Sequence, residues 1–279
     1  SPWYRRHMRR ALIVLALLLG CGSKREPAQH TQPRIVSLTP SATEVVAALG
    51  ATSELVGVDE FSKYPPEVDK LPKVGSFLAP NLEVIVQLTP TLVIVDDIHG
   101  QVAGALRDQG LTIVECSMHA LPDVKQALRT VGDKLGRAKQ ATAAIEDIDR
   151  ALDEAAAKRP ARHPRVLAII DREARGLGNL VAAGPGSWVD ELIAVVGGDN
   201  VLASSGVRYP KISREEVLTG DPEVILDLSF AGKSDTAAWK ELDVAAVRAG
   251  KVKALSDQYL LGPSPRVRQA LAALAAAIQ

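Results

Sequence analysis

Short apolar segments alternate with helical patterns along this chain, and the alternation occurs in two successive sets. The first set has apolar segments at residues 34–38, 55–58, 92–95 and 111–114, with helical patterns at 42–49, 82–88 and 101–109. Strands that alternate with helices in this way form parallel sheets that are covered by helices. We therefore predict an α/β lobe over residues 34–123.

The second set has apolar segments at residues 165–170, 180–183, 224–228 and 252–255, with helical patterns at 187–196, 214–218 and 267–278. The segment between the sets is rich in Ala, Lys, Glu and Asp and contains no Pro from Val124 to Lys158. It predicts one or two helices, with Gly132 and Gly136 as possible breaks. The predicted fold is thus two Rossmann-like α/β lobes with parallel sheets, joined by a long helical segment at 124–160, with the second lobe at 161–279.

The N-terminal region differs from the rest of the chain. A basic run that includes Arg9 and Arg10 precedes a continuously apolar stretch, 11–19, and then Gly20 and Cys21. This order is typical of a signal peptide, and the apolar stretch is about half the ~20 residues that a spanning helix needs. Residues 18–21 resemble a bacterial lipobox, which predicts a lipid anchor at Cys21. The alternative is an ordinary signal or anchor segment with an incidental Cys. Residues 22–33 are polar and predict a flexible tether.

Charge and cysteine usage exclude several classes of protein. Lys plus Arg is 33 and Asp plus Glu is 33, so the net charge is +0 and nothing points to a nucleic-acid partner. With only Cys21 and Cys116 present, neither a disulfide framework nor a thiolate metal site is available. Cys116 lies in an apolar context and is expected to be a small core residue.

Each lobe contains the same local pattern around one short helix. An N-cap residue is followed by Glu two positions later and by Pro nine positions later, in Asn81, Glu83 and Pro90 and again in Ser213, Glu215 and Pro222. Asn and Ser are favoured N-caps, and a carboxylate in the first turn suits the helix dipole, which alone could explain both Glu residues. Ser213 and Glu216 also fit a capping box, which would leave Glu215 facing outward.

Several ordered motifs resemble one known family. They lie at residues 34–44, 61–66, 71–75 and 81–83 in the first lobe, and at 188–193, 197–200, 209–215 and 263–266 in the second. Together they are similar to the cobalamin and iron-chelate substrate-binding proteins of ABC importers, over nearly all of residues 34–278. The resemblance implies a ligand cleft between two lobes whose helical connection permits only a small closure. It also implies a monomeric periplasmic binding protein rather than an enzyme, with no cofactor of its own.

The resemblance also implies where the importer binds. Proteins of this family dock on a permease dimer through one exposed glutamate in each lobe, and the matching positions here are Glu83 and Glu215. These are the two acids that the internal repeat singles out. Two separated carboxylates that meet arginines on a partner would fix its orientation through charge-assisted hydrogen bonds.

Aromatic residues make up only 4% of the chain, so their positions are informative. Ligands of parallel α/β sheets bind beyond the carboxyl ends of the strands, and large flat ligands favour aromatic walls. The candidates that flank predicted strands are Phe61, Tyr64, Phe77, Tyr209 and Tyr259, although each ring alone could equally fill a gap between loop and core.

The resemblance matches Phe61, Phe77 and Tyr209 to rings that contact the ligand and Asp257 to a cleft acid. Leu261 stands where the cobalamin binder has a cleft arginine, and residues 96–99 replace a segment with aromatic character.

Polar ligand contacts are predicted at Asp97, His99 and Arg266. A cleft histidine at position 99 could coordinate haem iron or cobalt, whereas a lone loop histidine is more commonly solvated. Four arginines are candidates for an anionic siderophore: Arg172, Arg175, Arg208 and Arg266. His119 and His163 show no paired metal-ligand spacing, and the sequence offers no clustered His and carboxylate set for a bare divalent metal.

Cobalamin or a related corrinoid is therefore the first expectation, with haem or a ferric siderophore as the alternative. A secreted α/β hydrolase is a distant alternative. Ser187 lacks the Gly-x-Ser-x-Gly elbow, and Gly176-Leu-Gly178 lacks the dinucleotide fingerprint.

Overall fold

The structure is a computed structural model that describes residues 32–229 and 236–279. The predicted signal peptide, with Cys21, and nearly all of the predicted tether lie outside the described residues. Within the described ranges, no helix is both long enough and apolar enough to cross a membrane.

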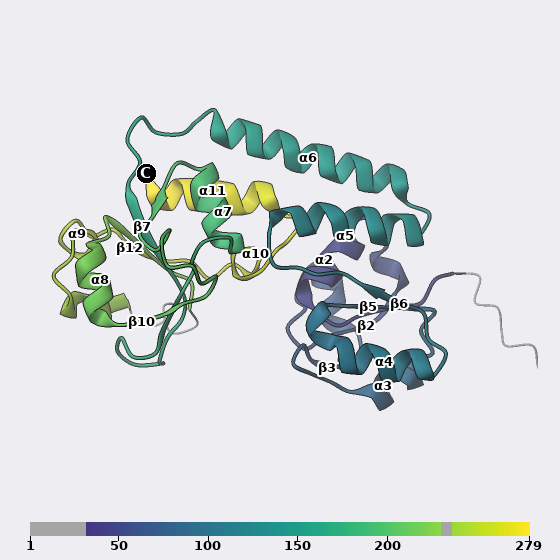
Figure 1. Cartoon of the computed structure of the whole chain (residues 1–279). Helices are drawn as coiled ribbons and strands as arrows, with labels where there is room; N and C mark the ends of the chain where they lie inside the picture. The colour runs from purple at the N-terminus through teal and green to yellow at the C-terminus, as the bar shows by residue number, and fades with distance from the viewer. Residues whose placement is uncertain (1–31, 230–235) are drawn as a thin grey trace, which may run out of the picture. The chain divides into compact units, whose positions relative to one another are not determined.

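The first lobe is built on a four-stranded parallel sheet in the order β2-β1-β5-β6 (Figure 1). The strands are β1 (Ile35–Ser37), β2 (Leu55–Val58), β5 (Leu92–Val95) and β6 (Ile113–Glu115). Its helices are α2 (Pro40–Ala48), α3 (Leu82–Gln87) and α4 (Gly100–Asp108), with short helical turns η1 (Thr52–Glu54), η2 (Pro66–Lys70) and η3 (Asp97–His99). A small ribbon of β3 (Gly75–Ser76) and β4 (Ala79–Pro80) completes it. All four predicted strands and three predicted helices are present.

The second lobe has a six-stranded sheet in the order β10-β8-β7-β11-β12, with β9 paired to β7. The strands are β7 (Arg165–Asp171), β8 (Leu180–Ala182), β9 (Asp199–Asn200), β10 (Lys211–Ile212), β11 (Val224–Asp227) and β12 (Val252–Ala254). The helical elements are α7 (Trp188–Val195), α8 (Arg214–Gly220), η5 (Thr236–Glu241), α9 (Ala245–Arg248), α10 (Gln258–Leu261) and α11 (Val267–Ile278).

This second sheet is mixed and so differs from the wholly parallel sheet that we predicted. Strand β8 runs antiparallel to β7, and β10 runs antiparallel to β8. The connection between β7 and β8, residues 172–179, contains no helix. A parallel crossover needs a dozen or more residues, so this short connection produces an antiparallel neighbour instead.

Two helices form the segment between the lobes: α5 (Leu121–Lys134) and α6 (Ala138–Ala156). The chain turns between them at Gly136, whose φ is 66°, a conformation that glycine adopts without steric cost. Helix α6 packs against α5 along one part of its length and against α11 and α7 along the other part (Figure 1). The predicted connecting segment, residues 124–160, contains all of α6 and most of α5.

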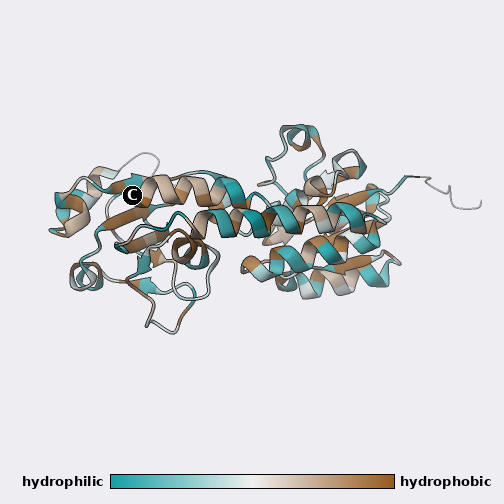
Figure 2. Ribbon diagram, turned by 90° about the horizontal axis from the view of Figure 1, so that it is seen from above, coloured by the Kyte–Doolittle hydropathy of each residue, from teal (hydrophilic) through white to brown (hydrophobic). Residues whose placement is uncertain are grey.

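One continuous apolar core passes through both lobes. It includes Val45 of α2, Leu128 of α5, Ile145 of α6, Leu192 of α7 and Leu274 of α11, all of them buried. Figure 2 shows the amphipathic pattern that builds it, because hydrophobic stretches of the helices alternate with hydrophilic ones. A shared core of packed helices resists independent movement of the lobes.

Candidate functional site

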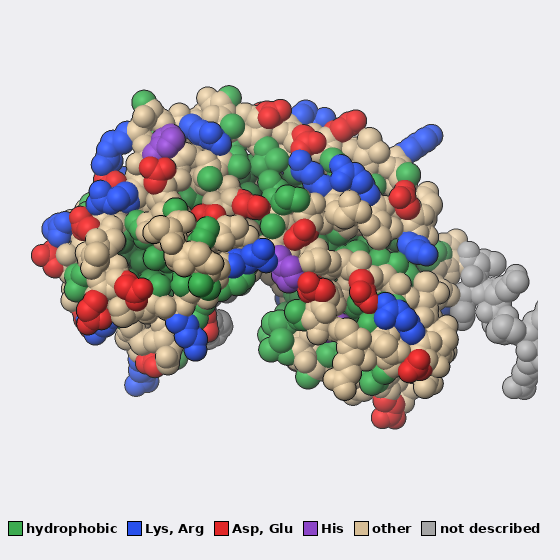
Figure 3. All heavy atoms as spheres, in the orientation of Figure 1, with side chains coloured by type: hydrophobic (Ala, Val, Ile, Leu, Met, Phe, Trp, Pro, Cys, Tyr) green, Lys and Arg blue, Asp and Glu red, His purple; other side chains and the backbone are tan. Residues whose placement is uncertain are grey.

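A cavity of about 690 Å³ opens between the two lobes. On the first lobe its wall comes from loops that follow β1, β2, β5 and β6. On the second lobe it comes from Tyr209, Ser256, Gln258 and residues 261–264. The first-lobe sheet is parallel, so its loops meet at the carboxyl ends of the strands, where such sheets bind ligands. In Figure 3 this face of the molecule is hollowed between the lobes, with hydrophobic side chains at the hollow.

Three of the five predicted aromatic residues line this cavity: Phe61, Phe77 and Tyr209. The rings of Phe61 and Phe77 meet edge to face, with centroids 5.8 Å apart and planes at 66°. Phe61 remains 50% exposed and Tyr209 43% exposed. Exposed rings on facing walls of one cavity are suited to enclose a large ligand with apolar faces.

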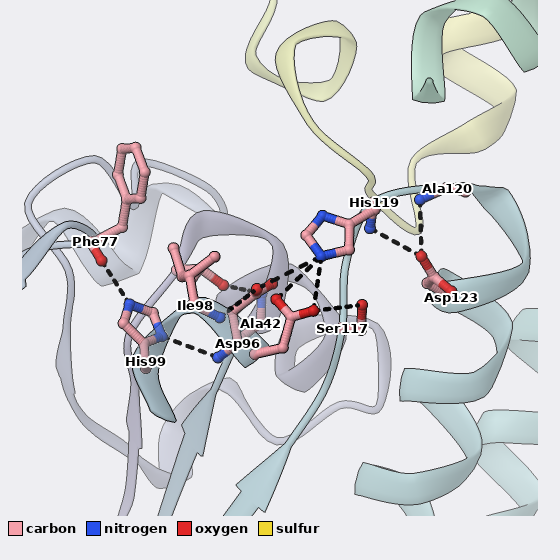
Figure 4. Close-up of polar contacts among 11 residues, drawn as sticks. Ala42, Phe77, Asp96, Ile98, His99, Ser117, His119, Ala120 and Asp123 are labelled. Carbon is pink, nitrogen blue, oxygen red and sulfur yellow. Dashed lines mark hydrogen bonds and ion pairs between the residues drawn. The ribbon is translucent and has the colours of Figure 1, made fainter. Parts of the chain in front are cut away.

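His99 anchors the loop that carries Phe77. Its Nδ1 accepts a hydrogen bond from the backbone N–H of Asp96 at 3.0 Å, so the ring proton is on Nε2, which donates to the Phe77 carbonyl at 2.5 Å (Figure 4). The side chain is only 3% exposed. His99 is therefore neither the solvated loop histidine nor the free metal ligand that the sequence suggested, because both ring nitrogens are already bonded.

Arg266 belongs to a hydrogen-bonded group that joins the lobes, and two members of this group, Glu44 and Ser264, line the cavity. Its Nε donates to Glu44 at 2.9 Å, its Nη2 also bonds Glu44, and Ser264 donates its hydroxyl to the same carboxylate. The guanidinium lies 4.0 Å from the centroid of the Tyr64 ring and 4.8 Å from that of Tyr259. Glu44, Tyr64 and Arg266 also line a second cavity, of about 730 Å³.

The structure thus separates the predicted ligand residues into groups. Six of the predicted ligand residues do not line the cavity between the lobes: Tyr64, Asp97, His99, Asp257, Tyr259 and Arg266. Asp257 is exposed and precedes α10, where it helps to raise the pKa of Tyr259, which is raised first of all by burial.

The other candidate arginines also lie elsewhere. Arg172 is fully buried and donates to Asp227 at 2.9 Å, an acid that also accepts from the Trp239 indole. Arg175 and Arg208 are exposed and absent from the cavity lining. Cys116 is buried and free, as predicted, and burial raises the pKa of its thiol to about 12.

Glu83 and Glu215 occupy equivalent positions on short surface helices. Asn81 caps α3 by accepting from the Val84 N–H, and Ser213 caps α8 by accepting from the Glu216 N–H. The predicted capping box is confirmed, because Glu216 accepts from the Ser213 N–H at 2.7 Å. Both Glu83 and Glu215 are exposed. Glu83 accepts from the Gln87 amide, whereas no partner for the Glu215 carboxylate occurs among the described residues.

The equivalence of the two helices extends further than the sequence indicated. Eight positions after its N-cap, each segment has a non-glycine residue with positive φ: Thr89 at 46° and Asp221 at 35°. A buried proline follows in both. Such residues are uncommon, so their recurrence at the same position supports a true structural repeat.

A cluster that sequence reasoning missed lies on the first-lobe wall. His119 Nε2 is 3.0 Å from Asp97 Oδ1 and 4.0 Å from Asp96 Oδ1 (Figure 4). Burial, together with a hydrogen bond to Asp97, raises the pKa of Asp96 to about 6. The hydrogen bonds from Asp96 and His119 lower the pKa of Asp97 to about 2. The sequence places Asp96 directly after β5 and His119 after β6. These two strands are neighbours in the sheet, so the residues that follow them meet at one edge.

Two α/β lobes, a helical connection and a cavity between them define a class of binding protein that encloses its ligand. The family model of the periplasmic binding proteins matches residues 35–259, and the chain belongs to that family.

Individual relatives agree with this assignment. The chain is 28% identical over 243 residues to a vitamin B12-binding protein of Vibrio cholerae, with 85% of this chain and 86% of that protein covered. The periplasmic heme-binding protein RhuT from Roseiflexus sp. RS-1 is similar in structure, with a TM-score of 0.79 at 31% identity over 89% of this chain and 100% of that one. The vitamin B12-binding protein BtuF of Vibrio cholerae gives a TM-score of 0.69 at 28% identity, covering 88% and 96%.

Proposed function

We propose that this protein captures cobalamin or a related corrinoid in the periplasm and delivers it to the permease of an ABC importer. The observation that carries the proposal is the cavity of about 690 Å³ with aromatic side chains from both lobes. Ligand sites of this kind measure roughly 300–1,000 Å³ and combine apolar walls with a few polar groups. The vitamin B12-binding relatives support the choice of ligand.

Haem is the second candidate, and a specific observation favours it. The TM-score to the heme-binding protein RhuT, 0.79, exceeds that to the vitamin B12-binding protein, 0.69. Haem and corrinoids are both large metal macrocycles, so an aromatic-walled cavity suits either.

A ligand titration tests the proposal and separates the two candidates. Cyanocobalamin, cobinamide and haem would each be added to the protein and followed by their visible spectra and by calorimetry. We expect saturable one-to-one binding of a corrinoid, and tighter haem binding would transfer the proposal to haem. If none of the three binds, the proposal is wrong.

For importer docking we propose Glu83 and Glu215, which would meet basic side chains on the two halves of a permease dimer. The exposed position of both acids and the repeated helix that carries each of them support this role. A monomer has one such pair, and we propose that the monomer is the docking unit.

The lipid anchor is also a proposal, which rests on residues 18–21 of the sequence. Mass spectrometry of the mature protein tests it. A diacylglyceryl-modified Cys21 at the mature N-terminus is expected, and cleavage without a lipid adduct would exclude the anchor.

A further inference from the structure

The first-lobe wall of the cavity carries a side-chain cluster that binding of an apolar macrocycle does not require. Asp96 and Asp97 follow strand β5, and His119 follows the neighbouring strand β6. Asp96 and His119 line the cavity. Figure 4 shows the His119 ring directed toward the Asp96 side chain, and His119 Nε2 also lies 3.0 Å from Asp97 Oδ1.

The distances within this cluster are those of a metal-ligand set. Each of the three residues offers one ligand atom, and all three atoms lie within 4.8 Å of one another. Metal–nitrogen and metal–oxygen bonds of about 2.0–2.2 Å place neighbouring ligand atoms roughly 3–3.5 Å apart. The separations of 3.0 and 4.0 Å from His119 Nε2 need only a small adjustment to reach that range.

The two carboxylates of this cluster have less positive charge beside them than the other buried carboxylates in the described part of the chain. Three other buried carboxylates pair with an arginine: Glu44 with Arg266, Glu54 with Arg137, and Asp227 with Arg172. Asp59 is the fourth, and it accepts hydrogen bonds from Ser62 and Phe61 beside Lys73.

Asp96 is only 6% exposed and has a second carboxylate beside it. Among residues 32–229 and 236–279, no Lys or Arg forms an ion pair with Asp96 or Asp97. A buried carboxylate normally has a positive partner, and a bound cation would supply it.

Outer contacts hold the ligand residues in place. Asp97 accepts a hydrogen bond from the Ser117 hydroxyl at 3.4 Å. Asp123 accepts from the backbone N–H groups of His119 and Ala120, both at 2.9 Å, which fixes the loop after β6. Hydrogen bonds of this kind orient ligands and are a regular feature of metal sites.

We propose that Asp96, Asp97 and His119 form a coordination site for a transition-metal ion, with its remaining positions open to the cavity. One imidazole nitrogen and two carboxylates suit zinc, cobalt, iron or nickel better than calcium, which takes six or more oxygen ligands. When the ion binds, Nε2 loses its proton to solvent and Nδ1 takes one up, so the neutral ring keeps a single proton and coordinates through Nε2. The ion is a free ion, because a metal held in a macrocycle has one open position on each face and cannot take three neighbouring protein ligands.

From the sequence, a bare metal was the least expected ligand because no clustered His and carboxylate set was visible. The tertiary structure brings such a set together. The inference uses the same cavity as the proposed function but does not depend on the identity of the macrocycle.

Titration of the whole chain with Co²⁺ tests the site, because bound cobalt has visible d–d bands that report its coordination. We expect saturable binding of one ion. His119→Ala and Asp97→Asn should each weaken it at least tenfold. The matched control is His163→Ala, since His163 lies 3.5 Å from Asp199 in another His–Asp pair and should not affect Co²⁺ binding. Unfolding temperatures of all variants check that the fold is intact.

Absence of saturable cobalt bands overturns the proposal, as does an unchanged affinity in the folded His119→Ala variant or an equal loss in the control. Haem and metal-free protoporphyrin are titrated into the same variants. Loss of affinity for Co²⁺ alone supports the three-ligand site, whereas loss for haem alone would mean a single axial ligand to a macrocycle and would overturn it. Failure of all macrocycles to bind would contradict the proposed function but would not affect the cobalt result.

Discussion

The two lobes share a capped surface helix with an exposed glutamate, but they differ in what they contribute to the cavity. Helices α3 and α8 agree in their cap, their exposed glutamate and their terminal residue of positive φ. The cavity walls are unlike. The first lobe supplies two phenylalanines with Asp96 and His119, whereas the second supplies Tyr209 and residues 261–264. A partner that meets both lobes requires equivalent surfaces, while an asymmetric ligand requires walls that differ.

The interiors of the lobes differ as well. Within the second lobe, a fully buried ion pair joins Arg172 and Asp227. The first lobe uses a buried chain of hydroxyl groups, in which Thr43 Oγ1 lies 2.5 Å from Ser37 Oγ and 2.7 Å from Ser62 Oγ. Removal of one partner from a fully buried charged pair is strongly destabilising, so Arg172 and Asp227 are the positions where a substitution in the second lobe should have a large effect.

The largest expected effect comes from reversing the charge of the exposed glutamate on both α3 and α8. In the double variant Glu83→Lys and Glu215→Lys, we expect transport to be abolished, because both charges that would meet the permease are reversed. Ligand affinity should not change. Glu146→Lys, an exposed acid on α6, is the control. Uptake in reconstituted importer and calorimetry measure the two properties, and lost ligand binding in the double variant would argue against a docking role.

Arg172→Met tests the difference between the lobe interiors. It leaves Asp227 buried without its positive partner, so we expect the free energy of unfolding to fall by about 3–5 kcal/mol. Urea denaturation measures the change. A loss below about 1 kcal/mol would mean that Asp227 finds another partner or takes up a proton.

Phe77→Ala and Tyr209→Ala test the two walls of the cavity separately. Each should weaken ligand binding by roughly 1–3 kcal/mol if the ring stacks on the ligand. Tyr64→Ala should leave affinity unchanged, since Tyr64 lies against Arg266 outside this cavity. Calorimetric titrations measure all three variants. An effect from only one wall would restrict ligand contact to that lobe.

The smallest expected effect comes from removing the N-cap side chain of α3 or of α8. Asn81→Ala and Ser213→Ala each remove a side-chain N-cap and should lower stability by about 1 kcal/mol. In Ser213→Ala the Glu216 carboxylate still accepts from the backbone N–H of residue 213, so the loss should be no larger than that in Asn81→Ala. Thermal unfolding compares the two variants, and a clearly larger loss in Ser213→Ala would mean that the Glu216 contact also depends on the serine hydroxyl.

Local sequence was sufficient for much of the fold. The strands, the helix caps and the repeated Glu83 and Glu215 could be located because each depends on residues within a few positions of one another. The aromatic candidates were found by their place after strands, and Phe61, Phe77 and Tyr209 do line the cavity. The antiparallel β8 could also have been predicted, had the length of residues 172–179 been compared with that of a crossover.

The sequence by itself determined the elements, their order and the two equivalent surface acids, because periodicity and capping are short-range properties of the chain. Only the tertiary structure decided that His99 is a buried support for Phe77 and that His119 meets Asp96 and Asp97. It also placed Arg266 on Glu44, although 222 positions separate them in the chain. Such contacts depend on which strands are neighbours and on the register of their loops, and the pattern of any one segment contains no information about either.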